Sequence, residues 1–243
     1  MKKCALITGA SGGIGSEIAL RLAKDGFNIA ACYCSDEKGI AELEKKLLQT
    51  DADYKLYKAD VSDYNSIKEV FADAAEVFGG VSVLVNNAGI AQQKLFTDIT
   101  QEEFDRITAV NFKGVFNCCQ CAVPYMVNKK AGKIINISSM WGICGASCET
   151  VYSATKAAVI GLTKALAKEL APSNVQVNCV APGAIDTKMN NNLTDEDKAA
   201  FAAEIPMGRF GTPREIAGVV SFLASPDSDY VTAQVITADG GLI

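Results

Sequence analysis

The chain has 243 residues, of which 49% are hydrophobic and 21% charged, a composition typical of one compact globular domain. Its net charge of -5 provides no overall positive field that would attract a nucleic acid. The chain contains no histidine, which excludes a Ser-His-Asp triad and histidine-ligated zinc. Acid–base chemistry must therefore use tyrosine, lysine, aspartate, glutamate or cysteine.

The N-terminus and the cysteines indicate the compartment. Only about five apolar residues separate the first lysines from the first glycine, too few for a secretion signal. No apolar run approaches the roughly 18 residues that cross a membrane. The nine cysteines are odd in number and scattered, and Cys118, Cys119 and Cys121 fall on one predicted helix as small apolar residues. We expect a cytoplasmic protein with no membrane, nucleic-acid or metal partner.

Short apolar or β-branched runs alternate with longer amphipathic stretches from end to end. Strands are predicted at residues 5–8, 29–34, 54–58, 81–85, 133–138, 175–180 and 235–237. Helices are predicted at residues 13–25, 37–49, 66–78, 104–126, 151–170 and 213–224. This alternation predicts a single α/β domain over residues 1–243, a Rossmann-type doubly wound parallel sheet of about seven strands with helices on both faces.

Residues 183–211 interrupt this alternation. The segment is polar, contains Asn190, Asn191 and Asn192, and carries a short acidic helical stretch around residues 195–203. A long excursion from a compact fold usually has a function. We therefore expect residues 184–211 to form a substrate lid.

A glycine-rich segment joins the first strand to the first helix. A hydrophobic strand ends at Thr8, and Gly9, Gly12, Gly13 and Gly15 follow as the helix begins. Free amides at a helix N-terminus bind anions, and missing side chains let a pyrophosphate approach the backbone. The spacing differs from the G-x-G-x-x-G fingerprint, but its position in the chain predicts a dinucleotide site.

The end of the second strand indicates which nicotinamide cofactor binds. An acidic side chain there would bind the ribose 2′-hydroxyl and repel a 2′-phosphate. Residues 31–35 read Ala-Cys-Tyr-Cys-Ser, and the first acid is Asp36. No arginine lies beside them, but the missing acid favours NADP(H) over NAD(H).

Three residues form a candidate catalytic group. Ser139 closes a predicted strand, and Tyr152 and Lys156 follow at the head of a helix. The i, i+4 spacing places Lys156 beside Tyr152, where its positive charge would lower the tyrosine pKa from about 10. Such a tyrosine can pass a proton to a reacting oxygen, and Ser139 can donate a hydrogen bond to the same oxygen.

Together these motifs make the chain resemble the classical short-chain dehydrogenases/reductases over its whole length. The matching segments are residues 8–15, 60–61, 86–89, 111, 139, 152–156, 182–183 and 238–241. The resemblance implies that Tyr152 exchanges a proton, Ser139 polarises a carbonyl and Lys156 also holds the nicotinamide ribose. It implies that Asn111 positions a relay water.

The same resemblance implies the cofactor contacts and the assembly. Asp60 and Val61 would contact the adenine, and Ile185 with Thr187 would meet the nicotinamide amide. A homotetramer would be built on the helices that begin near Asn111 and Val151. The implied cofactor-binding residues are Gly9, Ser11, Gly12, Gly13, Ile14, Gly15, Ser35, Asp60, Val61, Asn87, Ala88, Gly89, Tyr152, Lys156, Pro182, Gly183, Ile185 and Thr187.

Within this family the substrate stays open between two ketones. The chain resembles 3-oxoacyl-acyl-carrier-protein reductases, and it also resembles a reductase of the 5-aminopentanone group on a lysine of elongation factor P. The resemblance implies two basic positions at the active-site mouth for an acidic carrier, here Lys130 and Ser173, of which only one is basic. Trp141 and Glu149 are candidate substrate residues, since a carboxylate at position 149 could pair with an aminopentanone.

Two further alternatives complete the expectation. Sugar or steroid alcohols are a weaker third class of substrate. A protein of a different class, a catalytically silent NADP-binding regulator, would have lost Tyr152 or Lys156, and both are present. The sequence therefore predicts an NADPH-dependent carbonyl reductase, with acyl carrier protein or elongation factor P as the possible carrier of its substrate.

Overall fold

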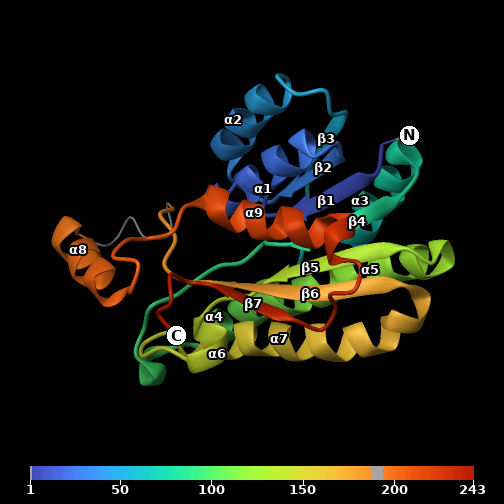
Figure 1. The fold of residues 1–243 in the computed structure, drawn as a ribbon. Helices are drawn as coiled ribbons and strands as arrows, with labels where there is room; N and C mark the ends of the chain where they lie inside the picture. Colours follow the sequence, from blue (N-terminus) through green and yellow to red (C-terminus); the bar gives the residue numbers. More distant parts are fainter. Residues whose placement is uncertain (1, 188–193) are drawn as a thin grey trace.

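The computed structural model describes residues 2–187 and 194–243 (Figure 1). Seven strands form one sheet in the order β3-β2-β1-β4-β5-β6-β7, and every pair is parallel. The strands are β1 (Cys4–Thr8), β2 (Asn28–Tyr33), β3 (Tyr54–Lys58), β4 (Val81–Asn86), β5 (Gly132–Ile137), β6 (Val175–Pro182) and β7 (Val235–Ala238). The predicted seven-stranded Rossmann-type fold is confirmed.

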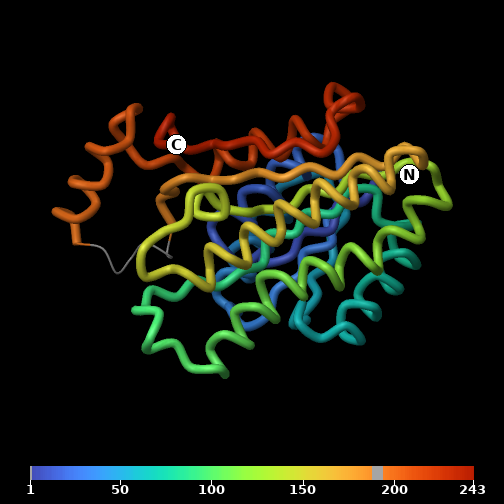
Figure 2. Tube along the Cα trace, turned by 90° about the horizontal axis from the view of Figure 1, so that it is seen from below, coloured from blue at the N-terminus to red at the C-terminus, as the bar shows by residue number. Residues whose placement is uncertain are grey.

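Helices cover both faces of this sheet, which is why every residue of β1 and β6 is buried. One face is covered by α1 (Gly13–Lys24), α2 (Glu37–Leu47) and α9 (Pro213–Ala224). The opposite face, towards the viewer in Figure 2, is covered by α3 (Tyr64–Phe78), α5 (Gly114–Lys129) and α7 (Thr150–Leu170). Because the strand order reverses at β1 and β4, the carboxyl ends of these strands open a crevice suited to a ligand.

Shorter elements connect the strands and helices of these layers. Three of them surround the carboxyl edge of the sheet, at the left in Figure 1: α4 (Gln101–Thr108), α6 (Trp141–Cys144) and α8 (Asp195–Glu204). The described residues also form the short helical turns η1 (Phe96–Asp98), η2 (Ala109–Lys113), η3 (Ala171–Ser173) and η5 (Pro226–Ser228).

The helix predicted at residues 104–126 is wrong as one continuous helix. A capping box between Thr100 and Glu103 starts α4 three residues earlier, and a π-helical turn, η2, separates α4 from α5. Asn111 lies in this turn, where its side chain bonds to the backbone of Ile90. A π-turn changes the direction of the residues it contains and often occurs at functional sites.

The segment predicted as a lid leaves and rejoins the body of the protein at one place. Ile185 forms a parallel bridge with Gly211, and Gly211 N donates to Ala184 O at 2.9 Å. Beyond this base, α8 has no buried residue and stands away from the sheet (Figure 1). Asn190, Asn191 and Asn192 lie outside the described residues. The lid therefore stays a prediction.

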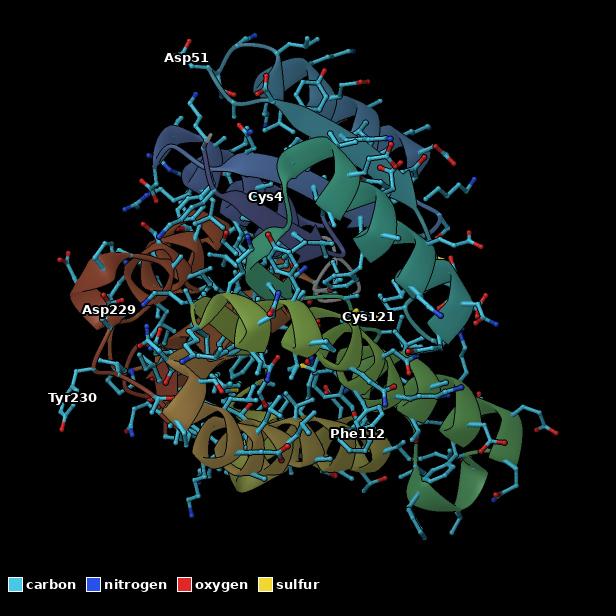
Figure 3. All side chains as sticks on the ribbon, turned by 90° about the vertical axis from the view of Figure 1, so that its right-hand side faces the viewer. Cys4, Asp51, Phe112, Cys121, Asp229 and Tyr230 are labelled. Carbon is cyan, nitrogen blue, oxygen red and sulfur yellow. The ribbon has the colours of Figure 1, made fainter. Side chains whose placement is uncertain are left out.

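All nine cysteines are free thiols. Cys118 and Cys119 are buried in the core, and Cys121 lies half-buried between α5 and α3 (Figure 3). Among residues 2–187 and 194–243, no helix has both the length and the apolar character needed to cross a membrane.

Candidate active site

The candidate site lies where four neighbouring strands end. The glycine-rich turn follows β1, residues 87–89 follow β4, Ser139 follows β5 and Gly183 follows β6. Parallel strands bring their carboxyl ends to one edge of the sheet, so segments more than 170 residues apart in sequence meet here. This is the edge beside α4, α6 and α8 in Figure 1.

The glycine-rich turn is packed too closely for side chains. Gly9 has a φ of +65°, and a Cβ there would lie 2.9 Å from Ala88 Cα. A Cβ on Gly15 would lie 2.2 Å from Gly9 O. Glycine is therefore required at both positions by the fold itself.

Asn87 and Thr8 hold this turn against the end of β4. The Asn87 Nδ2 group donates to both Thr8 O and Gly9 O at 3.1 Å. In return, Thr8 Oγ1 accepts from the backbone amides of Asn87 and Ala88, each at 3.0 Å. The predicted cofactor residue Asn87 thus has a structural task, because its amide shapes the turn.

The N-terminus of α1 fits an anionic group. Its N-cap residue, Gly12, has no side chain to bond to the first-turn amides, and the first turn carries no acidic residue. The helix dipole and these amides together favour a phosphate. A Cβ on Gly13 would lie 3.2 Å from Thr187 Cγ2, so Thr187 borders the same turn. The arrangement fits the pyrophosphate of a dinucleotide.

Asp60 and Val61 follow β3 near the same edge. Partial burial works to raise the pKa of Asp60, but hydrogen bonds from Ser62 and Arg106 outweigh it and lower the pKa. Arg106 Nη1 donates to Asp60 Oδ2 at 2.9 Å. Val61 is buried, and its carbonyl accepts from Asn117 Nδ2 at 2.9 Å. Sequence reasoning did not find Arg106, since it lies 46 residues further along the chain.

The structure brings Ser139, Tyr152 and Lys156 together. Lys156 Nζ lies 5.6 Å from the centroid of the Tyr152 ring. A hydrogen bond joins Ser139 to Tyr152, and Ser139 Oγ also accepts from Trp141 N at 3.2 Å. Lys156 is only 4% exposed, and its ammonium donates to Ile137 O at 2.9 Å.

Burial dominates the proton affinities of this group. It raises the pKa of Tyr152 to about 12, while the bond to Ser139 lowers it and the charge of Glu149 raises it further. Burial also lowers the pKa of Lys156 to about 8. The prediction that Lys156 brings the Tyr152 pKa below 10 is therefore wrong for the chain by itself, because desolvation acts on both groups.

Asn111 is completely buried beside Lys156. Its Oδ1 accepts from Ile90 N and its Nδ2 donates to Ile90 O, both at 2.8 Å. A Cβ on Gly89 would lie 3.3 Å from Lys156 Nζ and 3.4 Å from Asn111 Oδ1. The side chain of Asn111 therefore ties the segment after β4 to the π-turn, next to the lysine.

Glu149 and Trp141 lie in the segment between β5 and α7, and both are half-buried. Glu149 is the N-cap residue of α7, but its side chain makes no capping bond. Its carboxylate has no ion pair within the described part of the chain, and burial raises its pKa. The preceding carbonyl, Cys148 O, accepts from Lys94 N at 2.7 Å, which joins this segment to residues 91–98.

The two positions predicted to dock an acidic carrier lie away from the candidate site. Lys130 caps the C-terminus of α5 and Ser173 ends η3, so both precede the amino ends of β5 and β6. Asn174 Nδ2 donates to Lys130 O at 3.2 Å, which places them together at the edge opposite Tyr152. The expectation that Lys130 and Ser173 flank the mouth of this chain's own site is wrong. They lie at the amino ends of β5 and β6, and the full length of these strands separates them from the candidate site at the carboxyl ends.

Comparison with known proteins finds relatives that match nearly the whole chain. A family model described as enoyl-(acyl carrier protein) reductase matches residues 9–243. The 3-oxoacyl-(acyl-carrier-protein) reductase FabG of Thermotoga maritima is 44% identical over 241 residues, covering 99% of this chain and 98% of that protein. The corresponding reductase of Staphylococcus aureus is 42% identical over 242 residues, covering 100% and 98%. Nodulation protein G of Azospirillum brasilense is 43% identical over 244 residues, covering 99% and 98%.

Proposed function

The chain belongs to the short-chain dehydrogenase/reductase family, and on that premise we propose that it reduces a 3-oxoacyl group on an acyl carrier protein with NADPH. It is an NAD(P)-dependent oxidoreductase acting on C=O or CH–OH groups. The single observation that carries the proposal is the convergence of Ser139, Tyr152 and Lys156 at the dinucleotide end of the sheet.

The proposed chemistry uses each of these side chains. Ser139 donates a hydrogen bond to the ketone oxygen, and Tyr152 gives its phenolic proton to the same oxygen. Bound NADPH supplies the hydride that completes the reduction at the carbonyl carbon. The Lys156 ammonium stabilises the phenolate that remains on Tyr152, which is then reprotonated from solvent. Asn111 is proposed to hold a water in that path.

The proposed cofactor site follows the carboxyl edge. The N-terminus of α1, with Gly12, Gly13, Ile14 and Gly15, would bind the pyrophosphate. We propose the remaining contacts on the basis of the family pattern: Gly9, Ser11, Ser35, Asp60, Val61, Asn87, Ala88, Gly89, Tyr152, Lys156, Pro182, Gly183, Ile185 and Thr187. The lid at residues 184–211 would close over the substrate.

Exposed apolar side chains near the proposed mouth favour an acyl substrate. Leu95 is 60% exposed and Phe96 73%, both in the segment that Lys94 joins to Cys148. Ile143, in α6, is also exposed. Apolar side chains left in solvent commonly mark a surface that contacts a ligand or partner.

The test is reduction of an acetoacetyl thioester, followed by the loss of NADPH absorbance. Tyr152→Phe removes the acidic proton and keeps the ring, so turnover should fall by at least about 100-fold. The melting temperature and NADPH affinity should stay near those of the wild type. Near-normal turnover by the variant would refute the assignment of Tyr152.

A second candidate is reduction of a 5-aminopentanone group on elongation factor P. The carboxylate of Glu149, which has no ion pair among the described residues, favours it. A ketone with a terminal ammonium should then be reduced with about threefold to fivefold higher kcat/KM than its neutral isostere. Glu149→Gln should abolish this preference and leave the neutral ketone unaffected. Efficient reduction of acyl-carrier thioesters with no ammonium preference would favour the first candidate.

We also propose a homotetramer built on α5 and α7. Phe116 of α5 is 45% exposed, and it follows Val115, which is buried in the core. An apolar side chain at that position would be buried in a helix-to-helix contact between copies. Light scattering that gives the mass of one chain would reject this assembly.

A further inference from the structure

A charged cluster lies at the carboxyl ends of β2 and β3, outside the catalytic group. It consists of Tyr33, Glu37 and Lys58. In the parallel register Tyr33 is the neighbour of Lys58 across the two strands. Lys58 Nζ lies 2.5 Å from Glu37 Oε1, and Tyr33 Oη donates to Glu37 Oε2 at 3.1 Å. One carboxylate thus holds both a cation and a phenol at the ends of two strands.

This cluster borders the dinucleotide end of the sheet. A Cβ on Gly39 would lie 2.4 Å from Ser11 O, so the first turn of α2 rests on the glycine-rich turn. Ala10 N also donates to Cys32 O at 2.9 Å, which binds that turn to the end of β2. The adenosine ribose of a dinucleotide in this fold reaches the end of the second strand. A 2′-phosphate would therefore enter the space beside α2 and β3.

We propose that Lys58 favours NADPH by leaving Glu37 and pairing with the 2′-phosphate. We propose that Glu37 weakens this preference, because it competes with the phosphate for Lys58. The proposal rests on the NADPH-dependent function proposed above and identifies the residue that sets its cofactor preference. Lysine is a compact cation on a flexible stem, suited to pairing with a phosphate as a point charge.

The exchange requires little rearrangement. The side chains of Lys58 and Glu37 are 62% and 57% exposed, so their ion pair is screened by water and weak. When Lys58 leaves, Glu37 keeps its hydrogen bond from Tyr33. The neighbouring acid, Asp36, is the N-cap residue of α2, and its carboxylate accepts a hydrogen bond from Gly39 N at 2.9 Å. The N-terminus of α2 adds a favourable dipole for the phosphate.

The same strand offers a matched control. Lys55 Nζ lies 2.8 Å from Asp73 Oδ2, with side chains 44% and 41% exposed. Because the side chains of a strand alternate, Lys55 faces α3 while Lys58 faces α2. Loss of the Lys55 charge changes the net charge of the protein as much as loss of the Lys58 charge does. Lys55, however, lies away from the proposed 2′-phosphate site.

The test is titration of NADPH and NADH into the purified protein, followed by nicotinamide fluorescence. Lys58→Met should raise the Kd of NADPH about fivefold and leave that of NADH unchanged. Glu37→Gln should lower the Kd of NADPH by a similar factor. Lys55→Met should change neither. Raising the salt concentration should reduce the NADPH advantage of the wild type but not of Lys58→Met.

The outcomes separate this proposal from the proposed function. Tight NADPH binding by the wild type that Lys58→Met does not alter overturns the role of Lys58 and leaves the function intact. Equal weakening of NADPH and NADH by Lys58→Met also overturns it, since that pattern indicates general damage. A wild type that binds neither nucleotide refutes the proposed function itself.

Discussion

The proposed catalytic side chains and the Tyr33–Glu37–Lys58 cluster lie at the same edge of one sheet, but they differ in how firmly their partners are held. Lys156 and Asn111 are buried and bond to backbone groups of Ile137 and Ile90. Lys58 and Glu37 are exposed and bond to each other. Burial makes a polar partner obligatory, whereas exposed partners can be exchanged at little cost. We therefore expect the chemistry to depend on the buried region and the choice of cofactor to depend on the exposed cluster.

The largest expected effect tests the packed region. Gly15→Ala places a Cβ 2.2 Å from Gly9 O, a backbone atom held by Asn87, so the turn must move. We expect a loss of about 3 kcal/mol in the free energy of unfolding, measured by urea denaturation. Gly12→Ala, whose Cβ would meet only Gly9 O at 3.5 Å, is the matched control. Equal stability of the two variants would show that the turn is not tightly packed.

The next prediction concerns the cost of burying Lys156. Its folded pKa, about 8, lies below the ordinary value of 10.5. Below pH 8 both the folded and the unfolded chain hold the proton, so the full penalty of a buried charge is present. As the pH rises from 8 to 10.5 the folded state releases its proton first, and the penalty disappears.

Lys156→Met should therefore unfold at higher denaturant than the wild type at pH 7, by about 1 to 2 kcal/mol, while losing activity. This gain in stability is smaller than the pKa shift alone would give, because the variant also loses the hydrogen bond to Ile137 O. At pH 10 the advantage should shrink. If the variant were less stable than the wild type at pH 7, the contacts of the Lys156 ammonium would more than offset the cost of burying its charge.

The sequence predicted the strands within about two residues because apolar runs report burial directly. It also predicted that Ser139, Tyr152 and Lys156 lie close together, because their spacing places them on adjoining elements. It did not predict the π-turn at Asn111, because that turn depends on a bond to Ile90, 21 residues away. Lys130 was placed at the wrong edge of the sheet for a related reason. The family resemblance implied a role for this position, but it did not show at which edge of the sheet the residue lies.

Sequence analysis missed Lys58, although the strand prediction already placed it near the end of the second strand. Adjacent parallel strands end at the same edge, so the last residue of the third predicted strand lies beside the end of the second. Only the side-chain contacts in the structure show that Lys58 faces α2 and Lys55 faces α3. The Tyr152 pKa was misjudged because spacing reports a neighbouring charge, while desolvation depends on the packed structure.

The smallest expected effect tests the exposed Tyr33–Glu37–Lys58 cluster. Tyr33→Asp adds a carboxylate opposite Lys58 in the strand register, where it can bind a ribose 2′-hydroxyl and repel a 2′-phosphate. It also competes for Lys58 and removes the phenol that holds Glu37. We expect the affinity for NADPH to fall about tenfold and that for NADH to rise by less, reversing their order in fluorescence titrations.

Combining Tyr33→Asp with Lys58→Met separates these contributions. If the carboxylate acts by occupying Lys58, the double variant should bind NADPH as weakly as Tyr33→Asp alone, because the lysine is already lost to the phosphate. If it acts only by repulsion, the two losses should add. Additive losses would assign the reversal to repulsion by the new carboxylate, whereas a preference for NADH in the wild type would show that the end of β2 selects the other nucleotide.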